Sequence, residues 1–151
     1  MAYSTVEGRT QILDDSAAAV LDLAEAVAAL GEAYEQLDED SGDRLEAILF
    51  KPLQSAYGQL QRTHTEFAAR VGLNAAHFSQ PQQGAPEDPR ALLERAADAI
   101  QAADDALAEL QDTLLPVEVG DQELRSGLSG TRSLIAPLPD ACDDFIRTLG
   151  R

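Results

Sequence analysis

Apolar residues recur every seven positions in two long stretches of the chain. The first stretch covers residues 13–37 and contains two interleaved registers: Leu13, Val20, Val27 and Tyr34, then Leu23, Leu30 and Leu37. The second covers residues 93–115 in the same way: Leu93, Ile100, Leu107 and Leu114, then Ala96, Ala103 and Leu110. Residues spaced by three and four positions share one face of an α-helix. The pattern therefore predicts two straight helices whose apolar stripes are buried in a bundle.

Two further helical patterns contain prolines. Apolar stripes predict helices over residues 43–78 and 121–149, with Pro52 inside the first and Pro137 and Pro139 inside the second. Proline has no N–H group, and its ring collides with the carbonyl group four residues earlier. We therefore expect both helices to be kinked or broken at these prolines.

Turn and capping residues mark the ends of the predicted helices. Residues 79–88 are rich in Pro, Gly and Gln and form the clearest loop, and Asp88 followed by Pro89 is typical of an N-cap and a first helical turn. Asp121 is expected to cap the last helix, and residues 1–8 are expected to be a flexible arm because they show no apolar period. The predicted helices lie at about residues 10–37, 43–78, 89–115 and 121–149.

Together these elements predict an all-α fold with one domain over residues 9–151. Four helices of similar length joined by turns are typical of an antiparallel up-down-up-down four-helix bundle. In that topology the first and third helices would oppose each other across one diagonal of the bundle. The two proline-containing helices would then share the other diagonal.

The charge balance narrows the choice of partners. The chain has 27 acidic and 11 basic residues, which gives a formal net charge of -16. This charge opposes binding to nucleic acid or to an anionic membrane and favours a basic partner. No apolar run is long enough to span a bilayer, and the single cysteine favours a reducing, cytoplasmic location. Abundant Ala, with Arg strongly preferred over Lys, favours a bacterial genome rich in G and C, with a salt-adapted organism as the alternative.

His64 is the first candidate for chemistry because it lies at the edge of the second stripe. Histidine-phosphotransfer domains are helical bundles of similar size, but here the residues after His64 are Thr65, Glu66, Phe67 and Ala68, without the Lys and Gly of that motif. Neither histidine has a Glu three positions before it, as carboxylate-bridged metal sites require. His64 is therefore predicted to be a half-buried residue at the border of the core.

The other reactive residues also favour structural roles. Cys142 lies on the predicted core face, where a thiol behaves as a small apolar group. The acidic turn at residues 38–43 only partly resembles a calcium-binding loop, because Leu49 stands where the terminal Glu is needed. The same turn offers Ser41 and Asp43 as N-caps of the second helix. No cofactor is expected.

These observations favour a non-enzymatic acidic bundle that acts through protein–protein contact, as an adaptor, a regulator or a scaffold, with a partner or with itself. The pattern does not decide whether the chain is an enzyme, although it favours a non-enzymatic role. The alternative is a bundle that binds a small ligand or a metal in a pocket beside the prolines of the second and fourth helices. The candidate lining residues of that pocket are Pro52, Tyr57, His64, Glu66, Pro137 and Cys142.

Overall fold

The structure is a computed structural model that describes residues 4–82, 84 and 87–149. Of these residues 83% are helical, and none of them lies in a β-strand. The prediction of an all-α chain is confirmed. Most of the predicted stripe residues form the core, in which Leu23, Leu30, Ile100 and Leu107 are completely buried. The prediction is wrong for Tyr34 and Leu114, which are exposed: Tyr34 lies in the last turn of its helix, and Leu114 lies beyond the end of the second striped helix at Asp112.

Helix α1, Thr5–Gln36, begins earlier than its apolar stripe indicates. Ser4 is its N-cap and forms a reciprocal capping box with Glu7, since each side chain bonds to the other residue's backbone N–H, at 3.1 and 3.3 Å. Residues 4–8, predicted as part of a flexible arm, therefore cap and begin the helix. The rest of that arm, residues 1–3, lies outside the described residues.

The second helical path is continuous through its proline. It consists of α2, Glu39–Leu45, a π-helical turn η1, Glu46–Phe50, and α3, Lys51–Val71. In η1 the N–H of Lys51 donates to the carbonyl group of Glu46, five residues earlier. Pro52 cannot donate to the carbonyl group of Ile48, and the wider π turn accommodates both the missing donor and the proline ring. The N-cap of α2 is Asp38, which accepts from the N–H of Ser41 at 2.8 Å, rather than Ser41 or Asp43.

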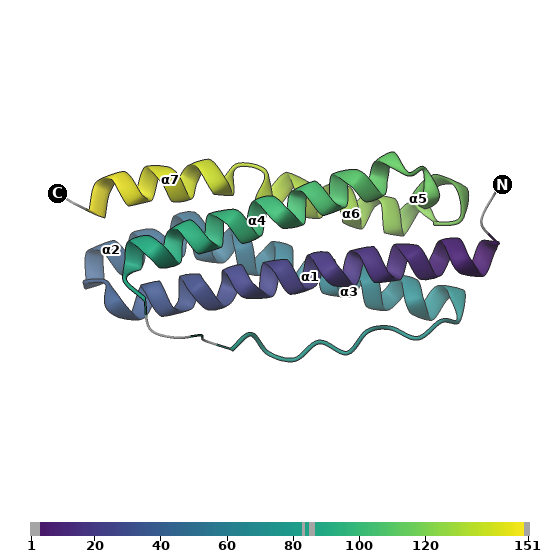
Figure 1. Cartoon of the computed structure of the whole chain (residues 1–151), viewed down its shortest axis with the longest axis horizontal. Helices are drawn as coiled ribbons and strands as arrows, with labels where there is room; N and C mark the ends of the chain where they lie inside the picture. Colours follow the sequence, from purple (N-terminus) through teal and green to yellow (C-terminus); the bar gives the residue numbers. More distant parts are fainter. Residues whose placement is uncertain (1–3, 83, 85–86, 150–151) are drawn as a thin grey trace.

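A long connector follows α3. Gly72 ends the helix in the left-handed conformation, with φ of 72°, and the N–H of Leu73 donates to the carbonyl group of Ala68. Residues 73–78, predicted to extend the helix, have no helical structure. The connector runs back along the length of the bundle to the start of the next helix (Figure 1).

Helix α4, Pro89–Asp112, begins where the sequence indicates, because the side chain of Asp88 accepts from the N–H of Ala91 at 2.8 Å. After Leu114, which has the left-handed conformation with φ of 67°, a short helix α5, Leu115–Glu118, follows.

The last helical path is interrupted. Asp121 caps α6, Gln122–Ile135, by accepting from the N–H of Leu124 at 2.8 Å, and α7, Leu138–Leu149, follows after a two-residue gap that contains Pro137. The predicted helix over 121–149 is thus two helices in the structure.

The order of directions differs from the up-down-up-down prediction. Helices α3 and α4 run in the same direction, and the connector carries the chain back between them (Figure 1). Two contacts place α1 antiparallel to α4: Gln36 Nε2 donates to the carbonyl oxygen of Glu87 at 2.8 Å, and Arg9 Nε donates to that of Val119 at 2.9 Å. Helix α1 packs most extensively against α4, so these two helices are neighbours and not a diagonal pair.

The reason for this difference is the length of the connector. Residues 72–88 span more than about 50 Å when extended. Helix α3 has 21 residues and is about 30 Å long. The connector is therefore long enough to pass along the full length of α3 before α4 begins. A short turn would have required α4 to run antiparallel to α3.

Close approach of α3 to α6 depends on two glycines. A Cβ atom at Gly127 would lie 2.1 Å from Thr63 Oγ1, and one at Gly130 would lie 2.4 Å from Gln59 Nε2. These glycines reduce helix propensity, but they create the space that the α3 side chains fill.

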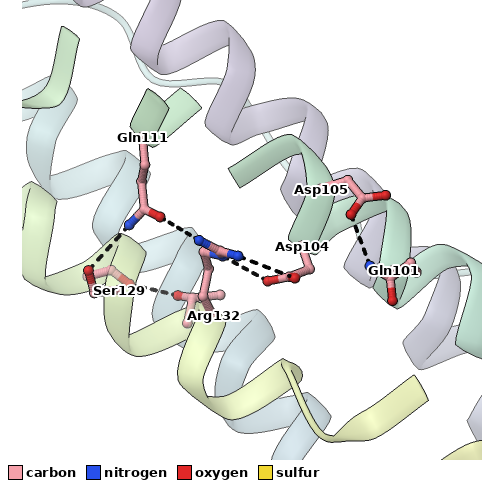
Figure 2. A network of polar contacts seen from close by, with 8 residues as sticks. Gln101, Asp104, Asp105, Gln111, Ser129 and Arg132 are labelled. Atoms are coloured by element: carbon pink, nitrogen blue, oxygen red, sulfur yellow. Dashed lines mark hydrogen bonds and ion pairs between the residues drawn. The ribbon is translucent and has the colours of Figure 1, made fainter. Parts of the chain in front are cut away.

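A polar network joins α4 to α6 on the outside of the bundle (Figure 2). Arg132 Nε donates to Asp104 Oδ1 at 2.9 Å, and Arg132 Nη1 donates to Gln111 Oε1 at 2.8 Å. Gln111 Nε2 then donates to Ser129 Oγ at 3.3 Å. Because the ion pair is partly exposed, its contribution to stability is at most about 1 kcal/mol, and its role here is to align the two helices.

Candidate functional site

His64 joins three parts of the molecule. It lies on α3 with only 1% of its surface exposed, and its Nδ1 is 2.8 Å from Ser16 Oγ of α1. Its Nε2 accepts from the backbone N–H of Ala76, in the connector, at 2.9 Å. Since Nε2 is an acceptor, the proton of the neutral ring is on Nδ1 and is donated to Ser16. His64 therefore holds the connector against α1 and α3.

The surroundings of His64 favour its neutral form. Ser16 Oγ in turn donates to the carbonyl oxygen of Leu13 at 3.1 Å. The ring of Phe78 lies edge-on to the imidazole of His64, with 5.2 Å between the ring centroids. Burial lowers the pKa of His64, and the negative charge of Asp14 partly opposes this shift. The residue is a buried connector clamp rather than the half-exposed histidine that its place on the stripe indicates.

A hollow of about 610 Å³ lies between α1, the η1–α3 segment and the connector. We call it the neutral groove. Its described lining residues come from these three elements: Val27, Ala28, Gly31, Phe50, Gln54, Tyr57, Gly58, Gln61, Phe78, Ser79, Gln80 and Pro81. None of these described residues is charged, although 25% of the chain is Asp, Glu, Lys or Arg.

Two glycines open the floor of the neutral groove. No described atom, apart from the local chain, lies within 4 Å of where a Cβ atom would stand on Gly31 of α1. On Gly58 of α3 such an atom would meet only the end of the Arg62 side chain, at 3.1 Å. The helix backbone is therefore accessible from the groove at both positions.

The walls combine aromatic rings with side-chain amides. Phe50 and Phe78 bring apolar rings from η1 and from the connector, and Tyr57 adds a ring with a hydroxyl group. Burial raises the pKa of Tyr57, and a hydrogen bond with Gln61 opposes this shift, so the hydroxyl group is protonated at neutral pH. The groove can therefore donate and accept hydrogen bonds without presenting a charge.

The neutral groove belongs to a region with few acids. Residues 50–84 contain a single acid, Glu66, and three bases, Lys51, Arg62 and Arg70. The other 26 acids lie outside this segment, so the α3 and connector side differs in charge from the rest of the protein.

A second hollow, of about 520 Å³, lies between α1 and α4, and we call it the acidic hollow. Its described lining contains five acids, one base and three alanines: Asp22, Glu25, Glu87, Glu94, Asp98, Arg95, Ala91, Ala99 and Ala102. Burial and the nearby charge of Glu25 raise the pKa of Asp22. Burial is the larger cause, and the charge of Glu25 adds to it without a nearby positive charge that opposes the shift.

The residues proposed for a proline-side pocket do not form one site. Tyr57 lines the neutral groove, whereas Glu66 lines a neighbouring hollow of about 440 Å³ together with His77. Pro52 is half-buried, and its main effect is the π turn before it.

The remaining two candidates lie on another part of the bundle. Pro137 is exposed between α6 and α7. Cys142 is fully buried in α7, and burial raises the pKa of its thiol to about 12, which leaves it protonated and unreactive at neutral pH.

Gly31, Phe50, Phe78 and Ser16 were not among the residues selected from the sequence. A count of charges along the chain would have found the acid-poor segment that contains two of them. Gly31, in the middle of a long stripe, was a second signal, because glycine is unfavourable inside a helix. Ser16 gave no signal, since its partner is 48 residues away.

No family model, curated protein or solved structure matches the chain. Within the described part of the chain, no three His, Cys, Asp or Glu side chains gather so that they could hold a metal ion. The described helices also include none that is both long enough and apolar enough to cross a membrane.

Proposed function

We propose that this protein is a non-enzymatic acidic helical bundle that acts in the cytoplasm through contact with another protein, as an adaptor, a regulator or a scaffold. In this proposal α1, the α2–η1–α3 path, α4 and the α6–α7 path act as the four rods of one bundle, with α5 as a connection. The observation that carries the proposal is the acidic hollow between α1 and α4, which favours a partner with exposed Lys or Arg side chains.

The geometry of the acidic hollow suits a cationic side chain. Asp22 and Glu25 of α1 and Glu94 and Asp98 of α4 line a depression whose other lining residues include three alanines. Small side chains permit close approach, and an incoming cation would pair with Asp22 and with Glu25, whose negative charge opposes ionisation of the partly buried Asp22. The same negative field disfavours nucleic acid and anionic membranes as partners.

Crosslinking and pull-down at low and high salt test this function. A double variant, Asp22→Asn with Asp98→Asn, removes two charges from the acidic hollow, and Asp43→Asn with Asp144→Asn removes two exposed charges elsewhere. We expect capture of a basic partner at low salt to be weakened by the first pair much more than by the second. Absence of any partner and of self-association at both salt concentrations would contradict the proposal.

Binding of a small molecule is a second candidate function, and the neutral groove favours it. Its volume of about 610 Å³ lies within the usual range of ligand sites, about 300–1,000 Å³. The proposal concerns an organic ligand in the groove rather than a metal beside Pro52 and Pro137. Thermal unfolding in the presence of a metabolite panel tests it, because a ligand that binds only the folded state raises the melting temperature. If no compound raises that temperature, the second candidate is rejected.

A further inference from the structure

We propose that the neutral groove binds a small uncharged molecule that combines an aromatic ring with a carboxamide or a similar hydrogen-bonding group. The ligand would lie against the half-buried helix backbone at Gly31 and Gly58. This inference rests on the second candidate function, and it is independent of partner binding at the acidic hollow.

The first argument concerns the two glycines. A glycine inside a helix costs about 1 kcal/mol relative to alanine. At Gly127 the cost has a structural reason, because Thr63 occupies the space of the missing side chain. At Gly31 no described neighbour occupies that space, and at Gly58 only the flexible end of Arg62 approaches it. Both positions line the same groove, and the empty space at Gly31 in particular is available to a molecule outside the chain.

The second argument concerns charge. The described lining of the neutral groove has no charged side chain, in a protein with a net charge of -16. An ion that enters such a site loses hydration, and the described lining residues themselves offer it no ion pair; a charged group that does approach the lining is the end of the Arg62 side chain beside Gly58. An anion would also be opposed at long range by the net charge of -16 of the whole protein, although the nearest segment, residues 50–84, contains few acids. An uncharged ligand avoids both costs.

The third argument concerns chemical groups. Phe50 and Phe78 provide apolar ring surfaces against which an aromatic ligand can pack. Gln54, Gln61 and Gln80 each offer amide donors and an amide acceptor, and these groups match both ends of a carboxamide. The required ligand is therefore apolar over its ring and polar at one edge.

The wall formed by the connector gives this site a defined shape. Phe78 contacts the ring of His64, and Ala76, two residues earlier, donates to His64 Nε2. The clamp at His64 thus positions the segment that supplies Phe78 and Gln80 to the groove. The site is assembled from α1, the η1–α3 segment and the connector together.

Matched pairs of small probes test the proposal. Benzamide and nicotinamide are uncharged at neutral pH, whereas benzoate and nicotinate have similar rings with a negative charge. Each is titrated into the full-length isotope-labelled protein while backbone amide NMR signals are followed. We expect benzamide and nicotinamide to shift the signals of Gly31, Gly58 and Gln80, and the two acids to leave them unchanged.

A variant that fills part of the neutral groove tests whether the probes bind there. In Gly31→Leu the new side chain projects into the open space, so the affinity for benzamide should fall at least about tenfold. Ala18→Leu adds the same side chain at an exposed position of α1 outside the groove, and it should change the affinity less than about twofold. Denaturant unfolding of both variants checks that the fold is kept, and Gly31→Ala serves as a smaller block if Gly31→Leu does not fold.

Three results would overturn the inference. The first is that neither uncharged probe shifts the groove signals up to its solubility limit. The second is that benzoate or nicotinate binds as well as its amide. The third is that a folded Gly31 variant binds benzamide with unchanged affinity. Since partner capture at the acidic hollow is measured separately, each of these results leaves the contact function standing.

Discussion

The two faces of α3 use helical glycines in opposite ways. Toward α6 the helix is closely packed, because Thr63 and Gln59 fill the spaces beside Gly127 and Gly130. Toward α1 and the connector it is open, since the spaces at Gly31 and Gly58 are not filled by packed side chains and both lie along the neutral groove. The same residue type thus marks a structural contact on one face and an available surface on the other.

This difference teaches how to interpret a glycine inside a helix. Its presence indicates that something approaches the backbone closely, but the helix sequence does not say what approaches. When a neighbouring helix occupies the space, the glycine is explained by packing. When the space is open, a ligand or a partner is the better explanation.

The largest effect on stability should follow from disrupting the close contact between α3 and α6. Gly127→Ala puts a methyl group where Thr63 lies, and the overlap should reduce the free energy of unfolding by about 3 kcal/mol. Urea denaturation measures the loss, and Ser126→Ala, at an exposed position of the same helix, is the control. Equal stability of these two variants would show that α3 and α6 are not closely packed.

A smaller loss is expected when the clamp at the open face is removed. His64→Leu keeps an apolar body but leaves Ser16 and the N–H of Ala76 without their partner, which should cost about 2 kcal/mol. Hydrogen exchange should also become faster at Ala76. His77→Leu, at an exposed position, is expected to change neither quantity, and slow exchange at Ala76 in His64→Leu would contradict the clamp.

Lowering the pH should reduce the free energy of unfolding by less than His64→Leu does, because protonation leaves the imidazole ring in place. The pKa of His64 is lower in the folded protein than its ordinary value of 6.5, so the unfolded chain takes up the proton first. The stability contribution of His64 is therefore complete above pH 6.5 and is lost as the pH falls toward the folded pKa.

Protonation at Nε2 also replaces the acceptor of the Ala76 N–H with a donor. Hydrogen exchange of Ala76, corrected for its intrinsic pH dependence, should accordingly accelerate below pH 6.5 in the wild type. His64→Leu should not show this pH dependence. The same dependence in both proteins would assign the effect to another group.

Replacing Gly31 should have a small stabilising effect, opposite in sign to the losses expected for Gly127→Ala and His64→Leu. Gly31→Ala adds a methyl group in open space within α1 and should raise the free energy of unfolding by about 0.5–1 kcal/mol, because alanine favours the helix. Thermal and urea unfolding measure the gain. A loss of stability would mean that the groove at Gly31 is closed in solution, which would remove the contrast with Gly127.

The smallest effect is expected at the acidic hollow. Asp22→Asn removes one of several crowded carboxylates and should stabilise the fold by a few tenths of a kcal/mol at low salt. Because the pKa of Asp22 is raised, protonation favours the folded state as the pH falls toward and through 3.8, opposite in sign to the effect of His64. If the gain in stability of Asp22→Asn does not decrease at high salt, repulsion between carboxylates is not its cause. Glu123→Gln, an exposed change on α6, is the control.

Much of the helical structure could be predicted from local sequence. The seven-residue stripes around Leu23 and Ile100 predicted buried helices, and Asp88 and Asp121 were correctly predicted as caps. These features depend on residues within one or two turns of each other, so a linear pattern contains them. The start of α1 could also have been predicted from local sequence, because Ser4 and Glu7 form the capping box that begins the helix.

The direction of α4 and the neutral groove were decided only by tertiary structure. Nothing local to residues 72–88 shows whether this segment turns back or crosses the bundle, and its path depends on contacts such as that between Ala76 and His64. The groove likewise exists because Gly31, Gly58 and Phe78, from three separate segments, meet in space. Helix formation follows from short-range bonding and periodicity, whereas a site between segments depends on packing that no single stretch of sequence contains.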